Sequence, residues 1–427
     1  MKTKVYAPGD KVLFKTKTRE WEGYVLESHD PEIILLKLQS GYNIGIRENE
    51  ILNAKLLEKS KELPKKEFKP EINKDKKNIA LIITGGTISS RLDSKTGAVI
   101  PTDGQAILNI VPEIKDIANI TTIKKPFLAL SENMSSFHWI KIAKTIEPLL
   151  NDESIDGIII AQGTDTISYT GTALSFFIKQ LNKPIAITYS QRSIDRGSTD
   201  AYLNLLCSAK YATSDIAQIA IIGHADSNDN SCIAINPTKT RKMHSSKRDA
   251  FKAINTSPIA KIAKSKEKIN LEILKEFKAK DKTKKVKMDI KYSPDVAIIK
   301  IYPGQDPGII EWYQKNGYKG LILETTGLGH VPSKDSKNNW IPKIKKAISS
   351  GMIICATAQT IFGNLNPNVY SAGRQLQKTG IIFLDDMLSE TAFVKLSWVL
   401  AHPNWKKSIK EKMLENISGE FNPNLKN

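Results

Sequence analysis

Two threonine-bearing segments contain the residues of this sequence that are best suited to chemistry. Each follows an apolar run typical of a buried strand: Leu81-Ile-Ile-Thr-Gly-Gly-Thr-Ile88 ends on Thr87, and Ile158-Ile-Ile-Ala-Gln-Gly-Thr-Asp-Thr166 ends on Thr164 and Asp165. Sites in α/β sheets lie beyond the carboxyl ends of the strands, so the two segments can converge on one pocket.

The chemistry that these residue types support is hydrolysis of an amide through an alcohol. That reaction needs a nucleophilic hydroxyl, a base to deprotonate it, and donors for the developing oxyanion. The two glycines before Thr87 let backbone N–H groups approach a ligand, and the polar loop from Ser89 to Gly104 is long enough to act as a lid. A lysine oriented by Asp165 can serve as the base, but composition does not single out one lysine.

Together the two segments resemble the threonine motifs of the L-asparaginase family, amidohydrolases that cut a side-chain carboxamide and release ammonia. In the family the active-site lysine precedes an Ala-Phe pair by about eight or nine positions, which matches Lys242 in the segment 239–251. Ser131 and Glu132 match the family's substrate-binding turn. The resemblance thus implies a catalytic set without a metal: Thr87, Thr164, Asp165 and Lys242. Which threonine attacks first stays open.

Other segments are similar to a narrower family, the D subunits of archaeal glutamyl-tRNA(Gln) amidotransferases. The similar segments are Gln359 to Arg374, Asp386 to Lys395, Thr326 to Pro332 and the Pro-Gly-Asp front of the chain. This resemblance implies a cytoplasmic chain that hydrolyses glutamine or asparagine and holds no cofactor itself. It implies a partner E subunit that uses ATP and Mg to convert Glu-tRNA(Gln) to Gln-tRNA(Gln). It also implies a homodimer of this chain within a heterotetramer.

The sequence departs from the asparaginase pattern at two places. Gln162 stands where family members usually carry histidine, and no tyrosine occurs between Thr87 and Ser131, where many asparaginases have one in the lid loop. Glutamine can still donate and accept hydrogen bonds, so we expect Gln162 to tune the site. We expect the lid to close properly only in the complex, because an ammonia donor should not hydrolyse glutamine while its acceptor is absent.

Two other functions are compatible with parts of the sequence. A free-standing asparaginase or glutaminase would have the same site. Three features count against it: the short strands before residue 56, the excess of basic over acidic residues, and the lysine-rich segment 264–293. An RNA-binding protein with a vestigial amidase site would explain the charge, but the intact site residues count against it.

Composition limits the class of protein. The 427 residues carry 63 Lys+Arg against 45 Asp+Glu, a formal charge of +18 with a pI near 9.5, which fits either a polyanionic partner or a lysine-rich surface. Three cysteines without CxxC spacing favour a reducing compartment and exclude a cysteine zinc site. The six histidines are too scattered for a zinc site, and no run reaches the ~18 apolar residues of a membrane span.

The spacing of apolar residues along the sequence predicts the strands and helices that must position these side chains. Short alternating strands before residue 56 predict a small antiparallel β-barrel, and lysine, glutamate and proline predict a linker over 57–77. Apolar runs alternating with helical stretches predict two α/β units with parallel sheets, over 78–263 and 294–427. The resemblance implies that these units are the two asparaginase-like domains. Residues 264–293 are lysine-rich, and we expect a connector or insertion there.

Overall fold

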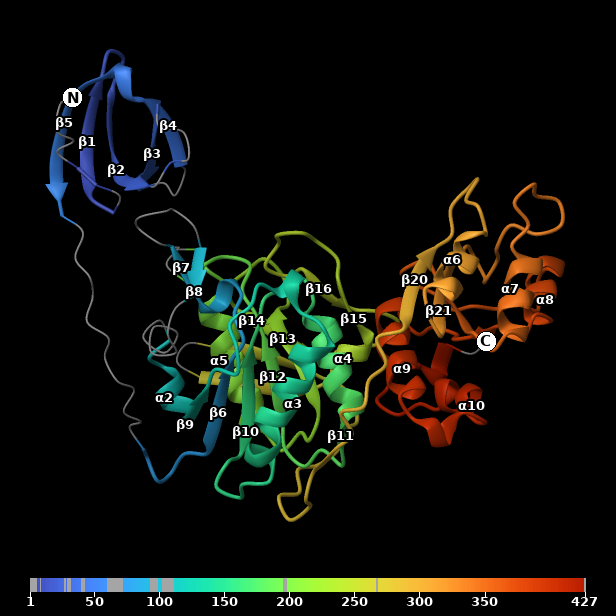
Figure 1. Ribbon diagram of the computed structural model, residues 1–427. Helices are drawn as coiled ribbons and strands as arrows, with labels where there is room; N and C mark the ends of the chain where they lie inside the picture. The colour runs from blue at the N-terminus through green and yellow to red at the C-terminus, as the bar shows by residue number, and fades with distance from the viewer. Residues whose placement is uncertain are drawn as a thin grey trace.

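The computed structural model describes residues 6–7, 9–26, 28, 32–39, 43–59, 72–92, 99–101, 111–194, 198–265 and 268–425. Along the chain it contains a small antiparallel sheet, a large α/β unit and a second α/β unit near the C-terminus (Figure 1). The expected α/β class with an antiparallel module in front is confirmed. No helix among the described residues is long and apolar enough to cross a membrane.

The N-terminal unit is a five-stranded antiparallel sheet in the order β4-β3-β2-β1-β5. Its strands are β1 Lys11–Thr16, β2 Glu20–Leu26, β3 Ile33–Leu38, β4 Asn43–Arg47 and β5 Ile51–Glu58. Alternate residues point inward, so Val12 and Phe14 enter a small core of their own. The sequence did not predict β5, whose residues are mostly exposed; it pairs with β1 and extends beyond the expected end at residue 56.

The large unit is built on an eight-stranded sheet in the order β18-β17-β14-β13-β12-β10-β6-β9. Five strands are parallel: β9 Asn119–Lys124, β6 Asn78–Ile83, β10 Gly157–Ala161, β12 Ile185–Thr188 and β13 Ile219–His224. Three follow as antiparallel strands: β14 Ser231–Ile235, β17 Ala260–Ser265 and β18 Lys268–Ile273. The expected parallel sheet is therefore present, and three antiparallel strands extend it, because a short turn after β13 reverses the chain without a crossover helix.

Helices cover both faces of this sheet, as the alternation of runs predicted. They are α2 Ile114–Ile117, α3 Ser136–Leu150, α4 Ile167–Phe177 and α5 Ala201–Ala212. In β6, Ala80 and Ile82 join the core under α3 and α4, whereas Leu81 and Ile83 join the core under α5. A strand buried on both faces reads as a continuous apolar run, which explains why β6 and β10 are legible in the sequence.

The segment 264–293, expected to be a connector, contributes strands. It provides β18 at the edge of the large sheet and β19 Lys287–Met288, which pairs with β11 Ile178–Lys179. Ile269 and Leu271 pack against the core at alternate positions, a period of two that the surrounding lysines obscure in the sequence.

The C-terminal unit has a parallel four-stranded sheet in the order β20-β21-β22-β23. Its strands are β20 Val296–Lys300, β21 Gly320–Thr325, β22 Ile353–Ala358 and β23 Ile382–Phe383. Its helices are α6 Ile309–Lys315, α7 Ile341–Ser349, α8 Ser371–Gln377, α9 Ser389–Leu400 and α10 Ile409–Leu414. Trp398 of α9 stacks on Phe176 of α4 at 5.7 Å, so α9 joins the two α/β units through a shared core.

Candidate active site

The loops that carry the two threonines meet because their strands are neighbours. β10, β6 and β9 lie side by side and parallel, so the loops after them leave the same edge of the sheet. Gly86 has φ +82°, and a Cβ on it would lie 2.3 Å from the Cα of Gly163, so the loops are in backbone contact. This packing requires glycine at both positions and places Thr87 and Thr164 one residue beyond the contact.

Lys242 makes the central contacts of the site. Its Nζ donates to Thr164 Oγ1 at 2.8 Å and to Asp165 Oδ1 at 2.7 Å. The lysine side chain is largely covered, with 19% exposed, whereas 55% of the Asp165 side chain is exposed. The structure therefore brings together a hydroxyl, an amine and a carboxylate that the sequence scatters over 78 positions.

Ser131, from the loop after β9, fixes the other side of Asp165. Its Oγ donates to Asp165 Oδ2 at 3.1 Å and lies 3.2 Å from the Asp165 backbone N–H. The Thr166 hydroxyl donates to the Ser131 carbonyl at 2.7 Å, a contact that the sequence analysis missed. The hydrogen bond from Lys242 holds the pKa of Asp165 below its usual range; partial burial opposes this, and Ser131 adds to it.

A short hairpin positions Lys242. Lys242 ends β15 Thr240–Lys242, which pairs with β16 Phe251–Ala253. Next to it, Arg241 Nε lies 3.3 Å from Glu390 Oε1 at the start of α9. The C-terminal unit therefore holds the strand that presents the lysine. Arg241 was not identified from the sequence, because only its neighbour Lys242 matches the family motif.

Thr87 opens the short turn η2 Thr87–Ser89 directly after the β6 loop and is half-buried. Within the described part of the chain its hydroxyl makes no hydrogen bond. Of the expected lid, β7 Ser90–Leu92 and β8 Val99–Pro101 form a hairpin, whereas the predicted lid residues Asp93, Ser94 and Thr96 lie outside the described residues.

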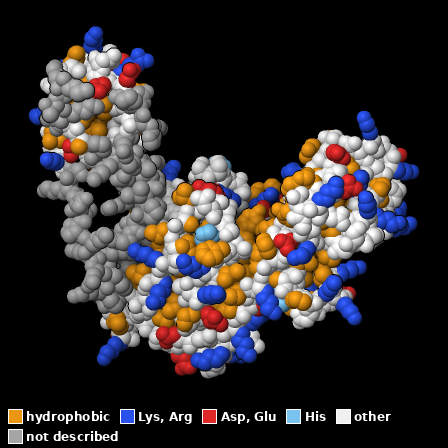
Figure 2. Space-filling model, in the orientation of Figure 1, with side chains coloured by type: hydrophobic (Ala, Val, Ile, Leu, Met, Phe, Trp, Pro, Cys, Tyr) orange, Lys and Arg blue, Asp and Glu red, His pale blue; other side chains and the backbone are white. Residues whose placement is uncertain are grey.

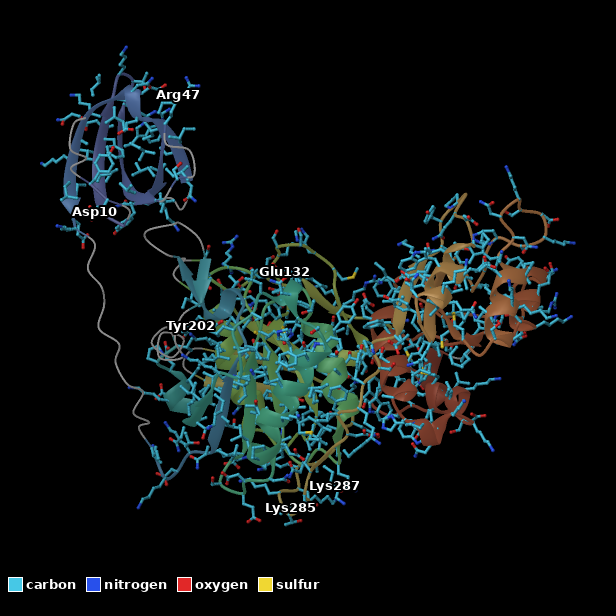
Figure 3. The ribbon with its side chains drawn as sticks, viewed as in Figure 1. Asp10, Arg47, Glu132, Tyr202, Lys285 and Lys287 are labelled. Atoms are coloured by element: carbon cyan, nitrogen blue, oxygen red, sulfur yellow. The ribbon has the colours of Figure 1, made fainter. Side chains whose placement is uncertain are left out.

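Glu132, predicted to bind substrate beside Ser131, has a different environment. It is exposed, and among the described residues no hydrogen bond or ion pair joins it to Asp165 or Lys242. Figure 3 shows it at one end of the large unit, with Lys285 and Lys287 at the other. Of the two residues of this turn, Ser131 alone joins the hydrogen-bonded cluster.

Gln162 is buried immediately before Gly163 and Thr164, with 1% of its surface exposed. Neither Nε2 nor Oε1 of its amide has a hydrogen-bond partner among the described residues. Such a pair of unsatisfied polar atoms is costly and is therefore uncommon away from functional sites.

The site is equipped for acyl transfer. It offers two hydroxyls, an amine in contact with one of them, and glycine-rich turns whose N–H groups can approach an oxyanion. The part of the chain that the structure describes contains no group of three or more His, Cys, Asp or Glu side chains placed to hold a metal ion.

Known proteins share both the sequence and the fold. Residues 78–275 match the family asparaginase, N-terminal; residues 295–413 match the glutaminase/asparaginase C-terminal domain; and residues 6–57 match the GatD N-terminal domain. The solved L-asparaginase of Thermococcus kodakarensis superposes with a TM-score of 0.70 at 25% identity, covering 81% of this chain and 99% of that one. The front module therefore lies outside the asparaginase fold.

Two curated relatives are named as D subunits of glutamyl-tRNA(Gln) amidotransferase. The one from Thermococcus kodakarensis is 43% identical over 409 residues, which is 94% of this chain and 91% of the relative. The one from Methanococcus maripaludis strain S2 is 41% identical over 423 residues, 98% of each chain. Similarity of this extent includes the front module and both asparaginase-type domains, and the chain belongs to the family of glutamyl-tRNA(Gln) amidotransferase D subunits.

Proposed function

We propose that Thr87, Thr164, Asp165 and Lys242 form the amidase site of this protein, with Ser131 and Glu132 binding substrate. The contact of Lys242 with both Thr164 and Asp165 supports this assignment most directly. Since Thr164 is already paired with Lys242, we assign the acyl attack to Thr87, whose hydroxyl has no competing partner in the described structure.

The reaction then runs in two steps. The Thr87 Oγ attacks the side-chain carboxamide of glutamine or asparagine, its proton passes to the leaving nitrogen, and ammonia departs as the C–N bond breaks. Water next cleaves the acyl ester and releases the free carboxylate. Lys242, oriented by Asp165, takes and returns the proton of the attacking group through the Thr164 hydroxyl.

We propose that the released ammonia passes to an E subunit, which uses ATP and Mg to amidate Glu-tRNA(Gln) in the cytoplasm. The family is named for this tRNA, and the relatives resemble the whole chain, including the front module that asparaginases lack. The chain itself would hold no cofactor.

We propose further that the chain forms a homodimer within a heterotetramer. Phe362, Val369 and Tyr370 are exposed apolar side chains in the segment 359–374, which carries the motif shared with the D subunits. Exposed apolar side chains that gather in one segment are typical of contact surfaces. Light scattering on the purified chain should give twice the chain mass; a stable, fully active monomer at assay concentration would count against the dimer.

One set of assays tests the proposed partnership. Glutamine hydrolysis is measured for the chain alone, with the E subunit, and with the E subunit, ATP and Glu-tRNA(Gln). We expect a rise of somewhat over a hundredfold in the full assembly, the scale of a coupling of ~3 kcal/mol. Equal rates for the lone chain and the assembly would instead favour a free-standing asparaginase or glutaminase.

A further inference from the structure

The hairpin that presents Lys242 is short. β15 and β16 pair over three residues each, and Lys242 stands opposite Phe251 at the end of this pairing. A two-stranded ribbon of this kind is marginally stable at best in water unless other elements support it. The contacts of its loop, residues 243–250, with neighbouring elements therefore help to fix where Lys242 points.

Arg248 anchors this loop. Its Nη1 lies 2.8 Å from both carboxylate oxygens of Asp229, and its Nη2 donates to the Ser198 carbonyl at 2.9 Å. The Arg248 side chain is largely covered, although most of the Asp229 side chain is exposed. A guanidinium that bonds a carboxylate and a carbonyl at once is fixed in direction as well as in distance. The loop is thus tied to the turn after β13 and to the segment before α5.

Tyr189, directly after β12, supports the same hairpin. Its ring packs on Phe251 with the ring centroids 4.6 Å apart, and its hydroxyl donates to the Arg248 carbonyl at 3.2 Å. Gly223 makes room for it, because a Cβ on Gly223 would lie 2.1 Å from the tyrosine hydroxyl oxygen. Tyr189 therefore contacts both the strand opposite Lys242 and the anchored loop.

His224, the last residue of β13, joins these two anchors. Its side chain is fully buried; Nε2 lies 3.0 Å from Asp229 Oδ1, and Nδ1 lies 2.6 Å from Asn204 Oδ1. Asn204 Nδ2 donates to the Tyr189 carbonyl at 2.9 Å. One histidine is therefore bonded on one side to the carboxylate that holds Arg248, and on the other side to the amide that holds Tyr189.

The partners of His224 indicate that the ring is cationic. The Tyr189 carbonyl can only accept, so the nitrogen of the Asn204 amide faces it and the amide oxygen faces His224 Nδ1. The Asp229 carboxylate also accepts, at Nε2. Both ring nitrogens thus face acceptors, and each carries a proton. A neutral ring would place a lone pair against one of these two oxygens.

Asp200 supplies a second negative charge near the ring. It lies at the start of α5, and its Oδ1 accepts from the backbone N–H groups of Gln191 at 3.0 Å and Arg192 at 3.1 Å. Burial raises its pKa, whereas these bonds and the charge of His224 lower it. The cationic ring thus has two carboxylates nearby, with Arg248 bonded to one of them. The other titratable groups around the ring are a buried hydroxyl and two buried thiols, of Tyr189, Cys232 and Cys207.

We propose that His224, Asp229 and Arg248 are positioning residues for the amidase reaction, a role that rests on the proposed function of Lys242 as the base. The protonated ring holds Asp229, Asp229 holds Arg248, and Arg248 holds the loop of the hairpin from which Lys242 reaches the Thr164 hydroxyl. When His224 gives up a proton, one of its two bonds is lost and the hairpin is held less firmly.

Steady-state hydrolysis of glutamine by the full chain tests this role. Asp229→Asn keeps the side-chain shape and removes the charge that Arg248 and His224 share. We expect kcat to fall roughly tenfold to a hundredfold with KM within about twofold, because the lysine is misplaced while substrate binding is untouched. Arg248→Lys keeps a charge and should recover part of the loss that Arg248→Met shows.

Glu311→Gln is the matched control. It removes a carboxylate charge from α6 that two lysines of α7 share at 2.9 and 3.4 Å, and kcat should stay within about twofold. Circular dichroism confirms that each variant is folded.

The pH dependence of turnover separates a charged positioning group from a merely structural one. His224→Gln keeps a donor toward Asp229 through its amide but carries no charge at any pH. The ratio of the turnover of the unaltered chain to that of His224→Gln should therefore be largest at low pH and decline toward one as His224 gives up its proton. A constant ratio from about pH 6 to about pH 9 would overturn the role of the charge.

Lys242→Ala distinguishes a failure of the positioning role from a failure of the proposed function. Turnover that survives in Lys242→Ala would overturn the amidase assignment itself. Turnover that is lost in Lys242→Ala but near normal in both Asp229→Asn and Arg248→Met would overturn only the positioning role. A rise in KM at unchanged kcat, or a loss in Glu311→Gln as large as that in Asp229→Asn, would overturn it as well.

Discussion

At the scale of single residues, the candidate site depends on a few short polar contacts. Lys242 bonds a hydroxyl and a carboxylate, and Ser131 bonds the second oxygen of that carboxylate. Asp165 therefore has both oxygens occupied by donors, which keeps it ionised and fixes its direction. This arrangement orients the lysine more firmly than a single ion pair on the surface would.

The proposed roles of the two threonines predict equal sensitivity to loss of the hydroxyl. Thr87→Val and Thr164→Val keep the side-chain shape, so folding should survive while glutamine turnover falls by ~10³-fold or more. Thr145→Val is the control, because this hydroxyl on α3 donates only to a helix carbonyl. Steady-state kinetics of the three variants measure the effect. Near-normal turnover in Thr87→Val would remove it from the site.

Gln162 adds a prediction about tuning. Its amide is buried beside Thr164 and has no hydrogen-bond partner among the described residues. Family members usually carry histidine at this position. The substitution Gln162→Leu therefore removes two unsatisfied polar atoms, and with them the polar group, from the site. We expect Gln162→Leu to raise thermal stability and to lower turnover, with Gln162→His retaining activity. Differential scanning calorimetry and kinetics on both variants measure this. A stable, fully active Gln162→Leu would show that the amide has no role.

At the scale of elements, the lysine-rich segment after β18 is anchored to the start of β10. Lys280 and Lys282 lie 2.8 Å and 2.7 Å from Asp156 Oδ1, and the Asn78 backbone N–H donates to its other oxygen at 3.0 Å. Burial alone would raise the pKa of Asp156, but these donors lower it to about 2. Two ion pairs thus hold a segment that the sequence predicted to be a connector or insertion.

The lowered pKa of Asp156 predicts the direction in which the stability of the protein changes with pH. Because the pKa of Asp156 is lower in the folded than in the unfolded state, its ionised carboxylate adds to the free energy of unfolding above pH ~4. This stabilisation is lost as the pH falls toward the folded-state pKa of about 2. Asp156→Asn should therefore cost ~1–2 kcal/mol in urea unfolding at pH 7, and less at pH 3. Asp335→Asn, an exposed carboxylate, serves as the control. A cost that is the same at both pH values would contradict the ion-pair account.

At the scale of the whole molecule, charge is unevenly divided along the chain. Residues 1–58 carry nine basic and nine acidic residues, whereas residues 264–293 carry eleven basic and five acidic ones. On the face shown in Figure 2, Lys and Arg are spread among apolar and acidic side chains and do not form one basic surface. The front module is thus electrically neutral, and shape or apolar contact is the better basis for its docking to a partner.

Separate cores allow the front module to be tested by deletion. The module has a core of its own, and Asn73 is bonded to Asn119 of the large unit at 2.9 Å, so a chain starting at residue 71 keeps this anchor. We propose the divisions 1–56, 57–77, 78–263, 264–293 and 294–427 as the domain organisation. Deletion of residues 1–70 should spare basal glutamine hydrolysis and weaken tRNA-dependent amidation, both measured by ammonia release and charged-tRNA assays. Equal loss of both activities would make the module a structural part of the amidase.

The local pattern of apolar and polar residues determined which segments form buried strands and which types of side chain are available to react. Buried strands such as β6 and β10 can be recognised because they are continuous apolar runs. The glycine before each threonine can also be recognised, because only glycine permits the close contact between the two loops. The family resemblance then identified Lys242, which composition does not. β18 was not predicted, although Ile269 and Leu271 alternate with polar residues, because the many lysines around it favoured a connector.

Only the tertiary structure decided which distant residues touch. Arg241 meets Glu390, Ser131 meets Asp165, and Ser418 bonds Ser175, which lies 243 positions away in the chain. Periodicity reports which face of an element is buried, but it contains no information about the partner on the other side. The pairing of β13 with β14, the packing of α9 on α4 and the path of the C-terminal tail supply those partners, and with them the geometry of the candidate active site.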